Sequence, residues 1–381
     1  MDVREDDYLL PVYPRQAITP ERGDGVMLRT RDGREVLDLY GGHAVALLGY
    51  GHPRLLAALR DQAERLLFQS NAVELEVRAR AARALVEFAP AGLTKAFLVN
   101  SGAEANENAL RLAFRHTGRS RVVALEGGFH GRTAAAGAVT HGAEKWYGFP
   151  ARPFAVTHVP VNDVGALERA LDDDTAALML EPVQGIAGAR DLDPAFLQAA
   201  RRRAEAVGAV LVFDEVQCGM GRTGHPFAAD LYGVTPDVLT TAKGLAGGFP
   251  AGAVLVSDRM AEGVGHGALG STFGGGPMAA AMIEAVIRTI VEENLLENVR
   301  RLSARIRERC CVGPVVAVRG AGFLLGLRTA PPAREVSAAL LERGILTGSS
   351  ADPHVVRVLA PLVLRTEHVD RLEAALREIT P

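Results

Sequence analysis

Short runs of apolar residues recur between residues 95 and 257, and stretches with helical spacing separate them. The runs are apolar at every position, as expected of strands that are covered on both faces. They span residues 96–99, 121–125, 176–180, 209–213, 238–240 and 252–256. Helical spacing marks residues 104–116 and 194–207. This alternation predicts an α/β fold with a mostly parallel central sheet flanked by helices.

The rest of the chain mixes short strands with helices. Residues 278–309 predict one long helix that leads out of the α/β region, and residues 367–379 predict a helix near the C-terminus. The pair Asp32-Gly33 is a hairpin signal near the N-terminus. We therefore expect residues 1–40 to form strands and turns that pack against the C-terminal part.

These patterns predict a large domain and a smaller α+β domain. The chain has 381 residues, which suits that organisation. We expect an N-terminal segment at residues 1–45 to pack with the small domain, the large domain at 46–275, and the small domain at 276–381.

Composition and charge narrow the classes of function. The net charge is −3 with acids and bases interspersed, which argues against a nucleic-acid partner. No apolar stretch approaches the roughly 18 residues of a membrane span, and the acidic N-terminus has no signal region. The three cysteines, Cys218, Cys310 and Cys311, form neither a disulfide framework nor a zinc spacing. We expect a reduced, cytoplasmic protein without a metal.

Lys243 is the most informative single residue. The chain has 42 basic side chains, and only Lys95, Lys145 and Lys243 are lysines. Arginine keeps its proton in proteins, whereas a desolvated lysine can lose it and become a nucleophile. Lys95 precedes a strand-like run and Lys145 lies in a polar stretch, so we expect both on the surface, but Lys243 follows an apolar run and precedes glycines. It is therefore a candidate catalytic amine.

The sequence Asn-Ser-Gly-Ala-Glu-Ala-Asn-Glu at residues 100–107 follows a predicted strand. Ser101 and Gly102 turn the chain, and a helix begins with acids in its first turn. Free backbone N–H groups and the helix dipole at such a start bind phosphate. Taken alone, the same residues also fit a plain serine N-cap.

Asp214 ends another buried run. An acid in that position needs a cation or a strong donor as partner, and a protonated pyridine nitrogen would serve. An ATPase would need a loop in which a lysine follows a glycine, and no lysine here does. Residues 219–224 match G-x-G-x-x-G, but a polar segment separates them from the strand and His225-Pro226 follows them, which disfavours a dinucleotide site.

A third motif, Gly-Gly-Phe-His-Gly-Arg-Thr, occupies residues 127–133. Phe129 lies between glycines after a strand and could stack on a flat cofactor, and Arg132 could bind a carboxylate with two hydrogen bonds. A glycine-rich loop with a surface arginine is the alternative. Together, a phosphate site, a stacking ring, a buried aspartate and a late lysine match what pyridoxal 5′-phosphate requires.

With these motifs, the chain resembles the class III aminotransferases of fold type I, and within them the acetylornithine aminotransferase group. The resemblance extends from about Leu10 to the C-terminal helix. Besides the motifs above, it rests on Phe-Asp-Glu-Val-Gln, Gly-Arg-Thr-Gly, Ala-Lys-Gly, Ser-Thr-Phe-Gly-Gly and Arg-x-Leu-Ala-Pro-Leu, which occur in the family's order.

The resemblance implies roles for individual cofactor-binding residues. Lys243 would hold pyridoxal phosphate as a Schiff base and move protons, and Asp214 would pair with the ring nitrogen. Gln217 would contact the ring hydroxyl, and Phe129 would stack on the ring. The phosphate would be bound by Ser101, Gly102 and Ala103, and by Thr272 of the neighbouring subunit in a homodimer with shared active sites.

The resemblance also implies the substrate contacts and the reaction. Arg132 and Ser271 would contact the substrate, and Arg357 would bind the α-carboxylate of glutamate. The implied reaction transfers the terminal amino group of N2-acetyl-L-ornithine to 2-oxoglutarate, a step of arginine biosynthesis. The alternatives are N-succinylornithine, ornithine or 4-aminobutyrate as donor, another type of pyridoxal phosphate enzyme, or a non-catalytic relative.

One residue departs from the family pattern. Glu-Pro-x-Gln-Gly is followed by glutamate in ornithine and many acetylornithine aminotransferases, and that glutamate pairs with the glutamate-binding arginine. Here Ile186 follows, and it cannot mask Arg357. This argues against free ornithine as the donor. The stretches at residues 40–45 and 347–350 resemble a subgroup that acts on N-acetyl- or N-succinylornithine.

Two further residues belong to the same region. We expect Glu181, at the end of a buried run, to lie near Asp214. His130 either helps to hold the cofactor ring or is a structural imidazole.

Overall fold

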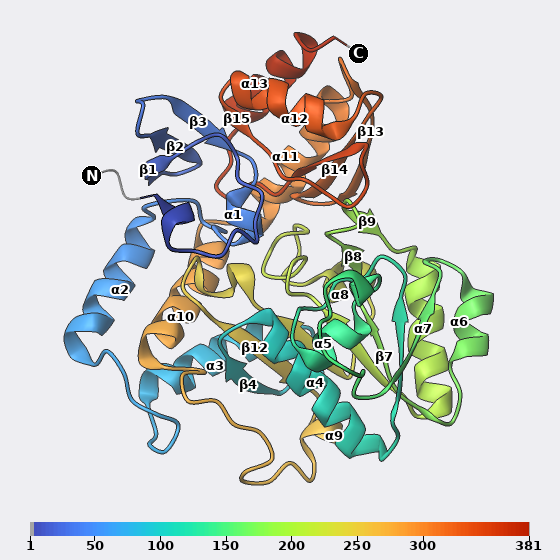
Figure 1. Cartoon of the computed structure of the whole chain (residues 1–381). Helices are drawn as coiled ribbons and strands as arrows, with labels where there is room; N and C mark the ends of the chain where they lie inside the picture. Colours follow the sequence, from blue (N-terminus) through green and yellow to red (C-terminus); the bar gives the residue numbers. More distant parts are fainter. Residues whose placement is uncertain (1–3, 381) are drawn as a thin grey trace.

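The computed structural model describes residues 4–380 and has two lobes (Figure 1). The larger lobe is built on one sheet, and the smaller lobe lies at the top of the view. The large sheet has the strand order β4 (Lys95–Val99), β12 (Gly252–Val256), β11 (Val238–Thr241), β10 (Val210–Asp214), β7 (Thr175–Leu180), β5 (Arg121–Leu125), β6 (Ala155–Val159). Strand β12 is antiparallel to both of its neighbours, and the other strands run parallel to one another. The prediction of a mostly parallel sheet is therefore confirmed.

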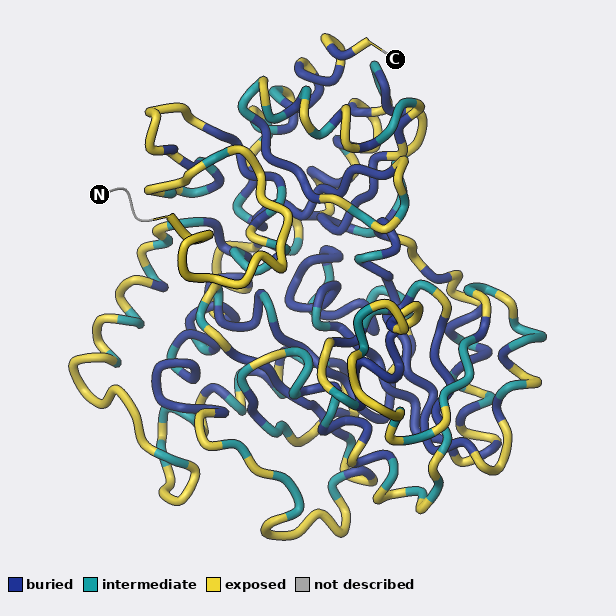
Figure 2. Tube along the Cα trace, viewed as in Figure 1, coloured by how far each residue is buried: buried dark blue, intermediate teal, exposed yellow. Residues whose placement is uncertain are grey.

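Helices cover both faces of the large sheet, and the burial of β10 shows the consequence. Leu211 and Phe213 pack into a core with residues of α7 (Pro194–Val207) and α10 (Pro277–Glu292). Val210 and Val212 pack into a second core with residues of α4 (Gly102–Thr117). Because successive side chains enter different cores, the strand is apolar at every position. Figure 2 shows the central strands as buried.

The remaining elements follow the chain order. The other helices are α1 (Gly41–Ala44), α2 (Pro53–Arg65), α3 (Glu76–Phe88), α5 (Ala134–Val139), α6 (Val164–Ala170), α8 (Ala228–Tyr232), α9 (Asp258–Ala261), α11 (Leu295–Arg309), α12 (Ala333–Glu342) and α13 (Thr366–Arg377). Single 3-10 turns occur at Glu5–Asp7, Ala143–Lys145 and Lys243–Ala246.

Three smaller sheets complete the structure. One has the order β1 (Pro20–Asp24), β2 (Met27–Thr30), β3 (Glu35–Asp38), β15 (Ile345–Leu346), and another has β13 (Val315–Ala321), β14 (Leu324–Thr329), β16 (Val355–Val358). Strands β8 (Val183–Gln184) and β9 (Arg190–Asp191) form a short ribbon. Strands β2 and β3 form the hairpin, and β3 pairs in parallel with β15 from the C-terminal part. The division at residues 45 and 275 stays a prediction.

The structure corrects two expectations. Residues 278–309 are not one helix, because the chain breaks between α10 and α11 at Asn294, whose φ is 50°. Strand β6 was not expected from the sequence and forms an edge of the large sheet. Among residues 4–380, no helix combines the length and apolar character that a membrane span requires.

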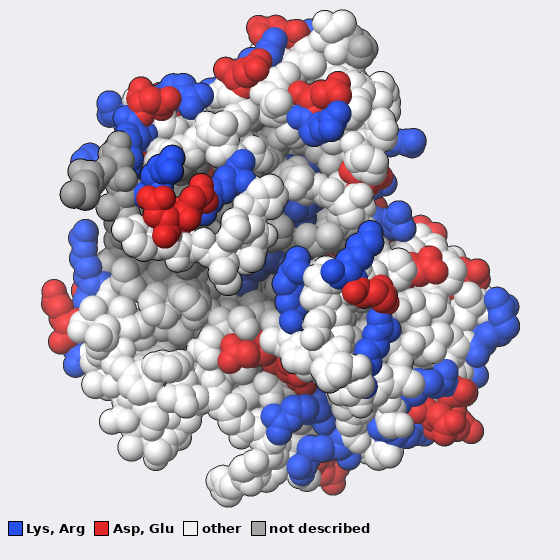
Figure 3. Space-filling view, viewed as in Figure 1, with Lys and Arg blue, Asp and Glu red and all other residues white. Residues whose placement is uncertain are grey.

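Acidic and basic side chains are interspersed on the face drawn in Figure 3. That face is hollowed between the two lobes, above the large sheet.

Candidate active site

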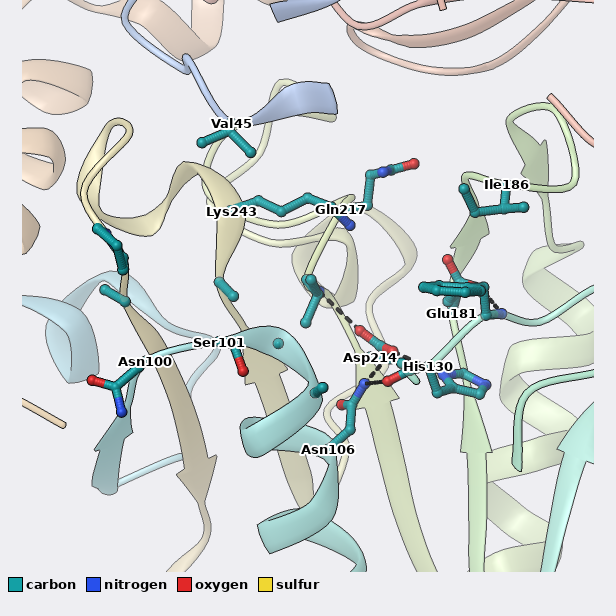
Figure 4. Close-up of a pocket in the computed structure, with 18 of the residues that line it drawn as sticks. Val45, Asn100, Ser101, Asn106, His130, Glu181, Ile186, Asp214, Gln217 and Lys243 are labelled. Atoms are coloured by element: carbon teal, nitrogen blue, oxygen red, sulfur yellow. Dashed lines mark hydrogen bonds and ion pairs between the residues drawn. The ribbon is translucent and has the colours of Figure 1, made fainter. Parts of the chain in front are cut away.

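A cavity of about 420 Å³ lies where the parallel strands of the large sheet end. Ligands bind at this edge of open α/β sheets because loops from several strands converge there. The lining comes from the turn after β4, the loop after β5, and the ends of β7, β10 and β11. Figure 4 shows side chains from these segments pointing toward one another.

One wall of the cavity is the N-terminus of α4, a helix of 16 residues. The Ser101 hydroxyl oxygen accepts a hydrogen bond from the Glu104 N–H at 3.2 Å, and the Glu104 carboxylate accepts one from the Asn100 N–H at 2.9 Å. A Cβ on Gly102 would lie 2.7 Å from Cγ1 of Val216, so the close approach there requires glycine. Gly102 and Ala103 line the cavity, and a helix start of this kind binds anions.

Asp214 is the centre of a buried polar network. Its Oδ2 accepts hydrogen bonds from Nδ2 of Asn106 at 2.7 Å and from Nδ1 of His130 at 2.8 Å. Its Oδ1 accepts from the Val216 N–H at 3.0 Å. Asn106 is itself held by the Thr240 hydroxyl, which donates to Oδ1 of Asn106 at 2.6 Å. These contacts fix the carboxylate in one orientation at the base of the cavity (Figure 4).

Asp214 also affects the pKa of its hydrogen-bond partner His130. Burial alone would lower the pKa of His130, but the hydrogen bond to Asp214 and the charge of that carboxylate outweigh burial and raise the pKa. Nε2 of His130 is buried and has no hydrogen-bond partner among the described residues.

The network includes residues that the sequence analysis did not identify. Asn106 and Thr240 are both buried, and Asn106 lies among the buried apolar positions of α4. A buried side-chain amide needs a hydrogen-bond partner. The asparagine at an apolar position of the helical pattern is therefore the only sequence signal that could have identified Asn106.

Lys243 follows β11 and extends across the cavity in Figure 4. Its φ is 46°, a strained conformation for a residue other than glycine, and such strain is concentrated at functional sites. Burial lowers the pKa of Lys243, and the neighbouring charge of Arg357 lowers it further against the opposing effect of Asp214 and Glu181. Within residues 4–380 the Lys243 amine makes no hydrogen bond, so it is available to react.

Glu181 stands at the end of β7 beside Asp214. Its Oε1 accepts a hydrogen bond from the Phe129 N–H at 2.8 Å. Burial and the charge of Asp214 raise the pKa of Glu181 to about 7. The two acids are close enough to affect each other, as expected from the sequence.

Arg357 is buried on β16 and donates to neutral oxygens. Its Nη1 lies 3.2 Å from the Gly185 carbonyl oxygen and 3.2 Å from Oε1 of Gln217, and its Nε donates to the Ser349 carbonyl. Burial lowers the pKa of Arg357 to about 10. No carboxylate within the described part of the chain forms an ion pair with it, and Ile186 lines the cavity next to Gly185.

The comparison with protein families identifies the chain. The family model described as aminotransferase class-III matches residues 11–380. The chain belongs to the class-III aminotransferases. This membership confirms the family expected from the sequence and the enzyme class that it implies.

Class-III relatives match over nearly the whole chain. A protein of Methanopyrus kandleri named acetylornithine aminotransferase is 42% identical over 385 residues, covering 100% of this chain and 98% of that protein. A Pseudomonas aeruginosa protein named succinylornithine transaminase/acetylornithine aminotransferase is 38% identical, covering 98% of this chain and 96% of its own. A structure of ornithine aminotransferase from Toxoplasma gondii, described as having partial occupancy of PLP at its active site, has a TM-score of 0.90 and 29% identity, covering 98% of this chain and 93% of that one.

The cavity of this class-III aminotransferase brings together most of the cofactor-binding residues expected from the sequence. Those that line it are Ser101, Gly102, Ala103, Phe129, Asp214, Gln217 and Lys243. Thr272, which was expected at the phosphate of a neighbouring subunit, is exposed on the loop after residue 270, and its role stays a prediction. In the described residues, no three histidine, cysteine or acidic side chains are grouped as a metal site requires.

The expected substrate residues surround the cavity without lining it. Ser271 contacts Asn100, which lines the cavity, and Nδ2 of Asn100 donates to the serine hydroxyl oxygen at 3.2 Å. Arg357 donates a hydrogen bond to Gln217, which lines the cavity. Arg132 is exposed, and its guanidinium carbon lies 4.5 Å from the centre of the Trp146 ring. The roles of these residues stay predictions.

Proposed function

We propose that this class-III aminotransferase binds pyridoxal 5′-phosphate and transfers the terminal amino group of N2-acetyl-L-ornithine to 2-oxoglutarate. The products would be N-acetylglutamate 5-semialdehyde and glutamate, as in arginine biosynthesis. The names of the Methanopyrus and Pseudomonas relatives support this class of donor. The observation that carries the proposal is the shared cavity of Lys243 and Asp214 beside a buried arginine that has no acidic partner among residues 4–380.

The cavity fits the cofactor because it leaves suitable groups without partners. Nε2 of Gln217 is buried and has no hydrogen-bond partner in the structure described for residues 4–380, and the ring hydroxyl of pyridoxal phosphate would accept from it. The N-terminus of α4 offers N–H groups to a phosphate. When bound, pyridoxal phosphate supplies the electron sink that stabilises negative charge at the donor carbon.

The residues of the chain would divide the remaining work. Asp214, fixed by Asn106 and His130, would keep a proton on the ring nitrogen. Lys243 would attach the cofactor through its amine. When not attached to the cofactor, the Lys243 amine would move a proton away from the donor's terminal carbon. The lowered pKa of Lys243 favours the neutral form that such a base needs.

The charges around the cavity favour an acylated donor. Free ornithine carries a second ammonium group, which Arg357 would repel because no acid in the described part of the chain neutralises the guanidinium. Acylation removes that positive charge and leaves a carboxylate for an arginine to bind. Ile186 adds an apolar surface suited to the donor's methylene chain. A succinyl group would add a second carboxylate, so N-succinylornithine is the alternative donor.

A second copy of the chain would complete the site. Several large apolar side chains are exposed near the loop that carries Thr272: Leu66, Leu67, Phe68, Val73 and Phe273. The rings of Phe68 and Phe273 lie 5.1 Å apart. Burying these side chains against a partner is favourable, and Thr272 would then reach the partner's phosphate site. Sedimentation velocity of the purified protein tests this, since a monomer would contradict the shared site.

A donor panel tests the reaction. Each donor is assayed with 2-oxoglutarate as the acceptor, and glutamate formation is measured. The donors are acetylornithine, succinylornithine, ornithine and 4-aminobutyrate. We expect the two acylated donors to have the highest kcat/KM. Ornithine as the best donor would refute the acyl-ornithine assignment.

The attachment residue needs its own control. Lys243→Ala is expected to abolish turnover and the visible absorption band that borohydride bleaches in the wild type. Lys95→Ala is the control, because Lys95 is an exposed lysine away from the cavity. It is expected to leave both the turnover and the absorption band unchanged. A borohydride-sensitive band in the Lys243→Ala protein would place the attachment elsewhere.

A further inference from the structure

The loop after β5 presents Arg132 on an aromatic surface. The guanidinium carbon lies 4.5 Å from the ring centre of Trp146 and 5.9 Å from that of Phe129. The two rings are 6.5 Å apart and inclined at 50°. A guanidinium at these distances is attracted by the negative face of an aromatic ring.

The hydrogen-bond donors of Arg132 are free. Among residues 4–380 no hydrogen bond or ion pair of the Arg132 side chain is formed. Stacking occupies the flat face of a guanidinium and leaves the N–H groups at its edge for a planar anion. A carboxylate is such an anion, and it can accept two parallel bonds from that edge.

The backbone around Arg132 is fixed on both sides. On the cavity side, the Phe129 N–H donates to Glu181 at 2.8 Å. On the other side, the Thr133 hydroxyl and the Ala135 N–H donate to Oε1 of Glu107 at 2.5 and 2.7 Å. The side chain has no such polar anchor. Within the described structure, its orientation therefore depends on the aromatic contacts.

Trp146 is held against helix α5, which follows Arg132. A Cβ on Gly137 of that helix would lie 3.5 Å from Cζ3 of Trp146 and 3.1 Å from Cε2 of Tyr147, so the small residue permits the close packing. The Tyr147 hydroxyl donates to the Ala134 carbonyl oxygen at 2.7 Å. The indole is thus fixed relative to the same loop that carries Arg132.

From this geometry we infer that Trp146 is a positioning residue, which holds the Arg132 guanidinium so that its edge binds the carboxylate of the amino donor. The inference rests on the proposed function, because it assigns a specificity device to that donor site. Trp146 itself does not contact the reacting atoms. It acts by restricting a long, flexible side chain that would otherwise lose conformational freedom on binding the substrate.

The test compares two donors that differ only in the carboxylate. N-acetylputrescine is N-acetylornithine without its carboxylate, so Arg132 has nothing to bind in it. Trp146→Leu is expected to lower kcat/KM for acetylornithine roughly three- to thirtyfold, mainly through KM. The value for N-acetylputrescine is expected to stay unchanged. An equal loss for both donors would overturn the inference, because a structural defect affects both.

Two variants guard against a folding defect. Trp146→Phe keeps an aromatic face and is expected to restore most of the affinity for acetylornithine that Trp146→Leu loses. Phe149→Leu makes the matched aromatic-to-leucine change at an exposed position of the same loop and is expected to keep the wild-type ratio of the two donors. A ratio altered as strongly by Phe149→Leu as by Trp146→Leu would contradict a specific role for Trp146.

A double-mutant cycle shows whether Trp146 acts through Arg132. In an Arg132→Met background, Trp146→Leu is expected to have no further effect on the KM for acetylornithine. A full additional loss in that background refutes the inference. A wild-type protein that uses neither acetylated nor succinylated donor would instead refute the proposed function.

Fluorescence gives a readout that a structural role would not change. Trp146 is the only tryptophan of the chain, so the tryptophan emission of the holoenzyme comes from this side chain alone. N-acetylnorvaline, which has the carboxylate but no terminal amine, is expected to change that emission on binding. The change is expected to vanish in Arg132→Met, and its persistence there would argue against the contact.

Discussion

Replacing Ile186 with glutamate would place an acidic side chain next to Arg357. Within residues 4–380, Arg357 donates to neutral oxygens only, and one of them is the Gly185 carbonyl, directly before Ile186. A glutamate at position 186 could reach the guanidinium from the cavity wall. The α-carboxylate of 2-oxoglutarate would then have to displace that glutamate before it could bind.

The contacts of Arg357 set the size of the effect. Its bonds to Gly185 and Gln217 are both 3.2 Å long, the weak end of the normal range. A hydrogen bond to a charged group contributes about 1.5–3 kcal/mol, against about 0.5–1.5 kcal/mol for a neutral one. The difference of about 1–2 kcal/mol corresponds to roughly five- to thirtyfold in affinity. We therefore expect Ile186→Glu to raise the KM for 2-oxoglutarate by that factor.

The two half-reactions separate this effect from general damage. Stopped-flow absorbance would follow the acetylornithine half-reaction and the 2-oxoglutarate half-reaction of the purified variant separately. The acceptor half-reaction is expected to weaken, whereas ornithine is expected to improve as a donor because the added acid neutralises Arg357.

Ile186→Gln provides the matched control, since glutamine has the same length without the charge. It is expected to leave the KM for 2-oxoglutarate within about twofold of the wild type, because a neutral oxygen replaces another neutral oxygen. If glutamine raised that KM as much as glutamate, shape and not charge would explain the effect, and the reasoning about Arg357 would be refuted.

Three further predictions concern the cavity walls. Ser101→Ala removes the acceptor of the Glu104 N–H and is expected to lower the free energy of unfolding by about 1 kcal/mol, measured with urea on the apoprotein, and Ser101→Thr is expected to lose less. Gly102→Ala places a methyl group 2.7 Å from Val216 and is expected to weaken pyridoxal phosphate binding about tenfold in equilibrium dialysis, and unchanged binding would exclude that turn as the phosphate site. Burial raises the pKa of Glu215 to about 8 from 4.5, so the folded state holds more protons than the unfolded state and stability falls as the pH rises through that window. Glu215→Gln is expected to reduce this fall between about pH 5 and about pH 8 in denaturant titrations, and an unchanged slope would assign it to other groups.

The buried strands could be predicted because their burial leaves a continuous apolar run. Every residue of β7 and β10 is buried, and both strands were expected from the sequence. Strand β6 escaped prediction because it pairs on one side only, with β5, and most of its side chains remain partly accessible. An edge strand of this kind carries no continuous apolar run.

The break between α10 and α11 was missed for a different reason. Apolar positions of both helices pack into the same core, so the helical spacing continues across the break. The break itself lies in the polar sequence Glu292-Glu293-Asn294, and asparagine is one of the few residues that readily adopts a positive φ. This short polar stretch is a weaker signal than the helical spacing of apolar residues on both sides of it.

For the site, residues with a local motif could be predicted and residues joined by the fold could not. Lys243 and Asp214 each follow an apolar run, which marks them as groups at strand ends. Asn106 contacts Asp214 across 108 residues of sequence, and Thr240 contacts Asn106 across 134. No short pattern encodes these contacts, because they depend on which strands and helices become neighbours in the sheet.

The turn at α1 shows the same dependence on distant segments. All four of its residues have positive φ, including His43 at 67° and Ala44 at 68°. A left-handed conformation costs roughly 1–2 kcal/mol for each residue with a Cβ, so the turn must be held by its surroundings. Asp38 accepts hydrogen bonds from the backbone N–H groups of Tyr40 and Gly41 at 2.7 and 2.9 Å.

The other end of this turn is held from the large lobe. The buried Arg222 donates to the Ala44 carbonyl at 3.3 Å and also to the carbonyl of Ala360, which follows β16. The next residue, Val45, lines the cavity. One arginine thus fixes the N-terminal segment and the strand that carries Arg357 relative to the same cavity wall. Because Arg222 has no acidic partner among the described residues, its hydrogen bonds to these carbonyls are what compensates for burying its charge. The left-handed turn at α1 is therefore held in its strained conformation by hydrogen bonds to Asp38 and from Arg222, at a point where the N-terminal segment, the large lobe and the segment after β16 meet beside the cavity.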